Sequence, residues 1–335
     1  MIKAQGLARE FRRKGRNADT VHAVRGVDID VGEGDLVGFL GPNGAGKTTT
    51  LRMLTTLLAP TAGEATVAGH DLRTDSVGVR RSIGYVAQGG GTAGESKVIE
   101  EIELQGELYG LSRTRAHERG AELVNQLDLA GLDQRLTKTL SGGQQRRLDI
   151  VLGLVHDPGL VFLDEPSTGL DPQSRANLWE HIRRLRADHG VTVFLTTHYL
   201  DEADALCDRI LVIDNGEIVA EGTPDELKAR VSGDGVTIGV PQDSISTAAE
   251  IAGNLTGAHE VTVADDSVGF RVPRGDTAMP EMLRALDKAG IQMLSAQVHR
   301  PTLDDVFLTL TGRSLRDAEA GEVEGDSTQE AANVA

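Results

Sequence analysis

The segment GPNGAGKTT (Gly41–Thr49) decides the fold of this chain, because of the sequence on either side of it. The apolar run Leu36–Leu40 precedes it as a predicted strand, and a helix is predicted to begin at Lys47. The three glycines leave backbone N–H groups free to converge on phosphate oxygens at the start of that helix. A glycine-rich turn without a ligand would be the alternative. The flanking strand and helix favour a phosphate-binding loop.

Further short apolar runs are typical of parallel strands buried on both faces. They are Leu36–Leu40, Ile83–Ala87, Leu160–Leu163, Val191–Leu195 and Ile210–Ile213. Turns that lead into helices follow most of them, which predicts an α/β fold of the P-loop NTPase class with ligands at the carboxyl ends of the strands. Helical patterns over Glu95–Tyr109 and His117–Leu127 predict a helical subdomain at about residues 89–155.

Charged side chains with a defined chemistry follow two of these strands. Lys47 is placed to reach the β- and γ-phosphates of a nucleotide, and the Thr48 hydroxyl to bind Mg²⁺. Asp164 and Glu165 end the run Leu160–Leu163, where two adjacent carboxylates are costly without a cation or a polarised water. Asp164 suits the Mg²⁺ shell and Glu165 the general base of hydrolysis. The alternative is an acidic helix start, which Pro166 argues against.

The segment LSGGQQRR (Leu140–Arg147) has two interpretations. Ser141 and Gln144 fit a capping box that starts a helix. Gly142 and Gly143 are poor choices for that purpose alone, since each costs about 1 kcal/mol against alanine within a helix. They are suited to a phosphate that approaches the backbone closely, and both roles can hold together.

Together, these motifs and the histidine after VTVFLTT resemble the nucleotide-binding subunit of ABC transporters, over about residues 2–223. The resemblance implies that Gln88 is the Q-loop residue, touching Mg²⁺ and water, that His198 contacts the γ-phosphate, and that Asp171 communicates across a dimer. It also implies that the LSGGQ segment acts in trans, in a head-to-tail dimer of two copies. Phe11 lies where the family places an aromatic residue on adenine; packing into the core is the alternative.

The expected site is therefore composite. The residues expected to line ATP are Phe11, Gly41, Pro42, Asn43, Gly44, Ala45, Gly46, Lys47, Thr48, Thr49, Ser141, Gly142, Gly143, Gln144 and Asp171. Those expected to act in hydrolysis are Lys47, Gln88, Glu165 and His198, and those expected at Mg²⁺ are Thr48, Gln88 and Asp164.

The sequence changes character near Val231. The predicted domains are an ATP-binding domain over residues 1–230, a small α+β domain over 231–313 and an acidic tail over 314–335. The order of elements in the second domain is β-α-β-β-α-β, which predicts a ferredoxin-like sandwich followed by a short helix. The tail carries six acids and one arginine and no aromatic residue, which predicts disorder.

The segment HRPTLDDVFLTLTGR (His299–Arg313) resembles the sequence of the drug-export branch of the family, which is typified by daunorubicin-resistance ATPases. That implies a separately encoded membrane permease as partner and a peripheral location at the cytoplasmic face of the membrane. GGGTAGESKVIEEIE after Gln88 departs from the usual family pattern at the surface that meets the permease. Other cargo, such as a lipid or polysaccharide, is the alternative, and a soluble ABC ATPase a more distant one.

The composition agrees with a soluble subunit that uses ATP. The net charge of −17 opposes binding to nucleic acid or to bare anionic lipid, so membrane contact is expected mainly through the permease. No apolar run reaches 18 residues and no signal-peptide core is present at the N-terminus. The single cysteine, Cys207, excludes an internal disulfide and is expected to be a buried apolar residue.

Overall fold

The computed structural model describes residues 1–12, 20–92, 94–231 and 233–314, which form two compact units. The first is Met1–Pro224 and the second is Asp225–Ser314. The division lies at Pro224, whereas the change in sequence character indicated a boundary after residue 230. Most of the predicted acidic tail and of the basic run RRKGR (Arg12–Arg16) lies outside the described residues.

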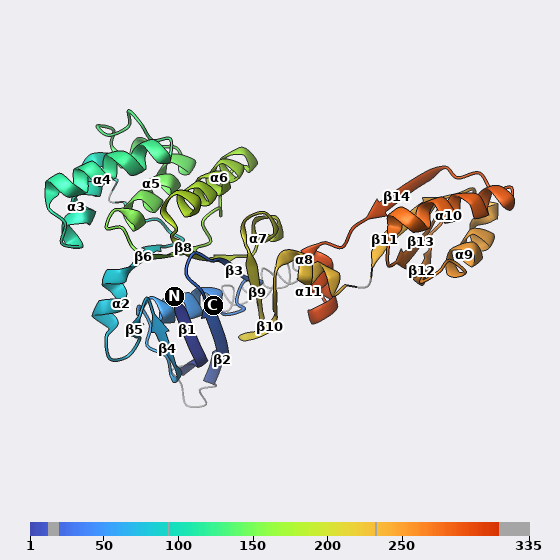
Figure 1. Ribbon diagram of the computed structural model, residues 1–335, viewed down its shortest axis with the longest axis horizontal. Coiled ribbons are helices and arrows are strands. Elements are labelled where there is room, and N and C mark those ends of the chain that lie inside the picture. Colours follow the sequence, from blue (N-terminus) through green and yellow to red (C-terminus); the bar gives the residue numbers. More distant parts are fainter. Residues whose placement is uncertain (13–19, 93, 232, 315–335) are drawn as a thin grey trace, which may run out of the picture. The chain divides into compact units, whose positions relative to one another are not determined.

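A six-stranded sheet in the order β10-β9-β3-β8-β7-β6 forms the centre of the first unit (Figure 1). All neighbours in it are parallel except β10, which runs antiparallel to β9. The strands are β3 (Leu36–Leu40), β6 (Ile83–Val86), β7 (Leu160–Asp164), β8 (Thr192–Thr197), β9 (Arg209–Asp214) and β10 (Glu217–Gly222). The predicted α/β fold is confirmed, and the carboxyl ends of β3, β7 and β8 carry the predicted loop, carboxylates and histidine.

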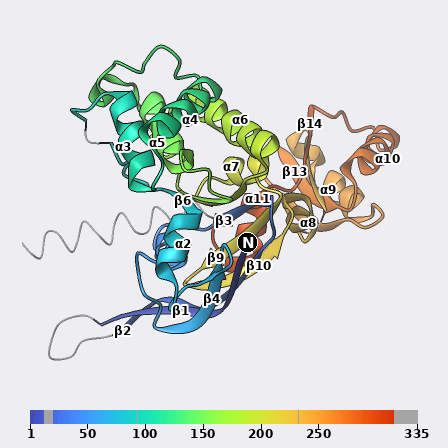
Figure 2. The ribbon, with the colours of Figure 1, turned by 60° about the vertical axis from the view of Figure 1, so that its left-hand side comes forward.

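A second sheet of this unit is antiparallel, in the order β2-β1-β4-β5. Its strands are β1 (Ile2–Arg12), β2 (Thr20–Val31), β4 (Ala62–Val67) and β5 (His70–Asp71). In Figures 1 and 2 the strands β1, β2 and β4 lie on one side of the central sheet and helices α3 to α6 on the other. Buried and exposed residues alternate over residues 2–5 of β1 and 27–31 of β2, as they do in a sheet with one solvated face.

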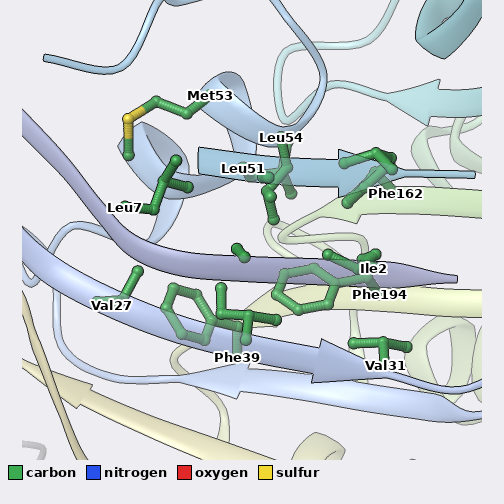
Figure 3. Close-up of a cluster of buried hydrophobic side chains, with 14 of the residues drawn as sticks. Ile2, Leu7, Val27, Val31, Phe39, Leu51, Met53, Leu54, Phe162 and Phe194 are labelled. Carbon is green, nitrogen blue, oxygen red and sulfur yellow. The ribbon is translucent and has the colours of Figure 1, made fainter. Parts of the chain in front are cut away.

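Helix α1 (Lys47–Leu54) lies between the two sheets and fixes the position of the phosphate-binding loop. Its Leu51, Met53 and Leu54 are buried against β1, β2 and the central strands (Figure 3). The rings of Phe39 and Phe162 stand 5.6 and 5.7 Å from that of Phe194, in tilted arrangements. Burying a side chain of this size contributes about 1.5–3 kcal/mol to stability. The buried face of α1 therefore fixes the position of its first turn.

Helices cover the other side of the central sheet. They are α3 (Val98–Leu108), α4 (Arg113–Gln126), α5 (Gly142–Leu154), α6 (Pro172–His189) and α7 (Leu200–Leu206). Helix α2 (Ser76–Ser82) packs instead beside β5, and its Val79 belongs to the core that α1 shares with the antiparallel sheet. Between β6 and β7 the described residues form α3, α4 and α5, so the predicted helical subdomain is present. Cys207 is buried, and burial raises the pKa of its thiol.

The second unit folds around one four-stranded antiparallel sheet in the order β12-β13-β11-β14. This is the predicted ferredoxin-like topology, since its strands and helices follow one another in the expected order β-α-β-β-α-β. Its elements are β11 (Asp234–Gly239), α9 (Ile245–Gly253), β12 (His259–Val263), β13 (Ser267–Val272), α10 (Gly275–Lys288) and β14 (Ser295–His299), with α8 (Pro224–Ala229) before and α11 (Leu303–Thr311) after them. A separate core holds it together, with Val236, Ile238, Phe270 and Met282 buried.

None of the helices in the described part of the chain combines the length and the apolar character that crossing a bilayer requires.

Candidate nucleotide-binding site

The glycine loop is held in a tight backbone turn between β3 and α1. A Cβ atom on Gly41 would lie 2.2 Å from the carbonyl oxygen of Ile213. Gly46 has φ 106° and a Cβ there would lie 2.5 Å from the carbonyl oxygen of Ala23. Neither position can hold a side chain without moving the backbone, so glycine is required at both.

A cavity of about 190 Å³ opens in front of this loop. It is lined by Ala23, Pro42, Asn43, Gly44, Gly46, Lys47, Thr48, Thr49, Gln88 and Glu165. The first turn of α1 faces it with backbone N–H groups, which makes it a site for an anion.

Lys47 is buried at the floor of this cavity, with 4% of its side chain exposed. Its Nζ donates to the carbonyl oxygens of Gly41 (2.7 Å) and Pro42 (3.0 Å) and lies 3.4 Å from Glu165 Oε1. The sequence placed Lys47 and Glu165 in the same site from motifs 118 residues apart (165 − 47), and the structure brings them into contact.

Asp164 and Thr48 meet at the end of β7. Thr48 Oγ1 donates to Asp164 Oδ1 across 3.3 Å, and Thr196 Oγ1 donates to the same oxygen across 2.7 Å. Asp164 is 2% exposed, so its charge is compensated by these hydroxyls rather than by water.

The Glu165 carboxylate is the centre of the site. Gln88 Nε2 donates to Oε2 across 2.8 Å and Thr168 Oγ1 across 3.2 Å. His198 Nδ1 lies 3.3 Å from the same oxygen, without the orientation of a hydrogen bond. Residues predicted from four separate stretches of sequence, which follow β3, β6, β7 and β8, thus converge on one carboxylate.

The backbone of Glu165 is strained. Its φ is 45°, in the left-handed region that costs a residue with a side chain about 1–3 kcal/mol. The N–H of Glu165 donates to Thr196 Oγ1 (3.0 Å) and to the Thr196 carbonyl (3.2 Å). Such strain persists only where the surroundings fix the backbone, which indicates that the direction of this carboxylate matters to the protein.

Two family models match the chain, and the first of them covers the phosphate loop, Gln88 and Glu165. The model described as "ABC transporter" matches residues 24–168, and one described as "ATP-binding protein DrrA1-3-like, C-terminal domain" matches residues 222–311. The chain is 44% identical to the daunorubicin resistance ATP-binding protein DrrA3 of Streptomyces coeruleorubidus, over 89% of this chain and 94% of that one. It is an ABC transporter ATP-binding subunit.

Two further comparisons agree with this assignment. The daunorubicin/doxorubicin resistance ATP-binding protein DrrA of Streptomyces peucetius is 42% identical over 99% of this chain and 96% of its own. The dimeric structure of the ATP-binding cassette MJ0796 with ADP and Pi matches with a TM-score of 0.60 and 25% identity, over 67% of this chain and 98% of that one. The resemblance stated from the motifs is confirmed, and the ABC subunit binds and hydrolyses ATP, as its family does.

The LSGGQ segment of this ABC subunit forms the start of α5. Ser141 is the N-cap: its Oγ accepts from Gln144 N (3.3 Å), and Gln144 Oε1 accepts from Ser141 N (3.0 Å). A Cβ on Gly142 would meet nothing within 4 Å, whereas one on Gly143 would lie 3.2 Å from Ser174 Oγ. The capping box is therefore real. The open space at Gly142 leaves the second interpretation, a close phosphate, available as well.

Asp171 and Phe11 are among the predicted residues that do not line the cavity. Asp171 is the N-cap of α6 and accepts from Ser174 N (2.9 Å) and Ser174 Oγ (2.6 Å), hydrogen bonds that lower the pKa of its carboxyl group. Phe11 is 39% exposed at the end of β1, and the Arg9 guanidinium stands 4.7 Å from the centre of its ring. The Phe11 ring is thus outside the buried core.

Sequence reasoning assigned no role to Arg146, which lies within the quoted segment LSGGQQRR. Its side chain is buried and donates to main-chain carbonyls at the end of β7 and in the loop that follows it. The only signal in the sequence is a charged residue at a helix position whose neighbours Leu148 and Ile150 are apolar, and this does not reveal which carbonyls it binds.

The surroundings of Glu165 predict a pH-dependent stability. Burial alone would raise the pKa of its carboxyl group, but the interaction with His198 and the charge of Lys47 outweigh it and lower the pKa from 4.5 to about 2. Because the folded pKa is below the unfolded one, this stabilisation is complete above pH 4.5 and is lost as the pH falls towards 2.

We expect the difference in unfolding free energy between the native chain and Glu165→Gln to shrink on acidification from pH 7 to pH 3, by on the order of 1–2 kcal/mol. Urea denaturation at both pH values measures it, with Glu217→Gln, an exposed carboxylate, as control. A difference that is the same at both pH values would contradict the ionic contacts of Glu165.

Proposed function

We propose that this subunit hydrolyses ATP as a head-to-tail dimer and drives efflux of a drug-like small molecule through a separately encoded permease, at the cytoplasmic face of the membrane. One observation supports the proposal of a dimer. The cavity of a single chain has the phosphate loop, the lysine and the base, while the glycine-rich start of α5 is absent from its lining and exposed. A second copy can bring that helix N-terminus, with its partial positive charge, to the γ-phosphate.

Lys47 and Glu165 fit a site that changes on nucleotide binding. The triphosphate competes for Lys47 Nζ, which otherwise contacts Glu165. Withdrawing that positive charge raises the pKa of the Glu165 carboxyl group and makes it a stronger base for the attacking water. Gln88 and His198 already face the same carboxylate and are positioned to hold that water and the γ-phosphate.

The residues present fit Mg²⁺. Thr48 Oγ1 and Asp164 Oδ1 are hard oxygen donors 3.3 Å apart beside the cavity. Mg²⁺ in a nucleotide site usually keeps several waters and is bound by one or two protein groups together with phosphate oxygens. Thr48, Asp164 and Gln88 would hold the ion. When bound, it neutralises charge on the β- and γ-phosphates.

Drug efflux is supported by the similarity to the two resistance proteins, which includes the second unit. We propose the same class of cargo here, and Phe11 as the residue that stacks on adenine. Asp171 is proposed to communicate between the two copies.

Co-expression with the permease tests the efflux. Cells carrying both proteins should accumulate less daunorubicin than cells carrying the permease with Glu165→Gln. Membranes should show ATPase activity stimulated by the drug. Equal accumulation in both strains, or stimulation by lipid or polysaccharide substrates in place of the drug, would contradict drug efflux while leaving the ATPase assignment intact.

A further inference from the structure

One arginine holds the strained loop that carries the proposed base. Arg146 lies on α5, five residues after Ser141, and is 7% exposed. Its Nε donates to the Pro166 carbonyl (2.8 Å), and its Nη2 donates to the carbonyls of Asp164 (2.8 Å) and Glu165 (3.3 Å). Three successive carbonyl oxygens, before, at and after the residue with φ 45°, thus bind one guanidinium group.

The same guanidinium group also holds the strand end that precedes Gln88. Arg146 Nη1 donates to the Ala87 carbonyl across 2.6 Å and lies 3.8 Å from Asp149 Oδ2. Asp149 Oδ1 in turn accepts from Gly91 N across 3.1 Å. Arg146 and Asp149 therefore fix the backbone on both sides of Gln88, whose amide donates to Glu165.

These contacts suit arginine alone among the cationic side chains. A guanidinium group is a planar fork with donors on three nitrogens, and here each nitrogen has a carbonyl acceptor within 2.8 Å. Lysine has one nitrogen and would reach only part of this set. Burial lowers the pKa of Arg146, while Asp149 and Asp164 oppose that shift.

We propose that Arg146 is a positioning residue for hydrolysis: it holds the backbone of Glu165 and the strand end before Gln88 in register with α5. Since α5 begins with the LSGGQ segment, the base of each site is tied to the helix that faces the nucleotide of the other site. This inference rests on the proposed dimer and on Glu165 as the base. Arg146 itself is not among the residues that line the nucleotide cavity.

The test is a comparison of kcat and nucleotide affinity in three variants of the full chain. Arg146→Gln should lower kcat by about 10–10²-fold, the effect of displacing a catalytic group by about 1 Å, with the Kd for ATP within about threefold of native. Arg146→Lys should lie between Arg146→Gln and the native chain. Arg186→Gln is the matched control, because Arg186 also binds a main-chain carbonyl (Gly34, 2.8 Å) and a carboxylate (Asp208), away from the site. Its kcat should stay within about twofold of native.

A native kcat in Arg146→Gln, or losses of kcat and of ATP affinity in equal proportion, would overturn the proposal. If Arg146→Gln does not fold, Arg146→Lys alone tests the proposal. The kcat of Arg146→Lys should then be lower than native while its thermal unfolding midpoint stays close to native. A native kcat in Arg146→Lys would overturn the proposal. Glu165→Gln is measured beside them. A reduced rate in Glu165→Gln with a native rate in the arginine variants would contradict the role of Arg146 and leave the assignment of the base intact.

Discussion

Replacing Glu165 by glutamine is expected to lower the ATP turnover of this subunit by about 10²–10⁴-fold, the usual contribution of a general base. The amide keeps the size of the carboxylate but cannot accept a proton from water. The change leaves the phosphate loop untouched, so the affinity for ATP should stay close to native. Phosphate release at saturating ATP and equilibrium binding of a fluorescent ATP analogue measure the two quantities.

Glu217→Gln provides the matched control, since Glu217 is an exposed carboxylate on β10 with 61% of its side chain accessible. It should hydrolyse ATP at the native rate. If Glu165→Gln also keeps a rate near native, Glu165 is not the base. A fall in rate explained by lost ATP binding would point instead to a role in nucleotide affinity.

Lys47→Ala is expected to weaken ATP binding by about 10–10²-fold, because a hydrogen bond to a charged group contributes about 1.5–3 kcal/mol. The change also leaves Glu165 buried without its nearest lysine, so the variant should be less stable at neutral pH. Isothermal titration with ATP measures the affinity, and circular dichroism confirms that the variant is folded.

The control for this change is Lys138→Ala. Lys138 is half exposed and pairs with Glu95 across 2.8 Å, outside the cavity. It should bind ATP as the native chain does. A native affinity for ATP in Lys47→Ala would contradict the role of Lys47 in binding the phosphates, whatever the effect of the change on stability.

The sequence predicted the central sheet and the site because each motif follows a strand with an unbroken apolar pattern. A parallel strand buried on both faces, such as Leu160–Leu163, can be read without knowledge of its neighbours. The carboxyl ends of such strands meet at one edge of the sheet, so Lys47 and Glu165 could be placed together from the pattern. Gln88 and His198 were added to them by the resemblance to the family.

The antiparallel sheet was missed because its strands carry a weaker pattern. β1 holds register shifts between Ala4 and Leu7 and between Arg9 and Glu10, and β4 is six residues long and begins with Ala62 and Gly63, which are weak strand formers. Register shifts of this kind break the period of two on which strand prediction depends. Pairing of β1 with β4, more than 50 residues later, has no local signal in the sequence.

The contacts of Arg146 could not be predicted for a different reason. Its acceptors are main-chain carbonyls, which every residue has, and their convergence depends on the left-handed backbone of Glu165. Nothing in the residue types Asp-Glu-Pro specifies that conformation. The strain and its support become visible only when α5 and β7 are placed side by side.

The molar mass of Glu165→Gln with saturating Mg²⁺ and ATP, measured by light scattering, tests most directly whether two copies close around the nucleotide. The account predicts a shift from the 35.6 kDa chain to twice that mass, and no shift in a variant that also carries Ser141→Arg at the start of α5. A mass that stays at 35.6 kDa with ATP bound, both alone and together with the permease, would contradict it.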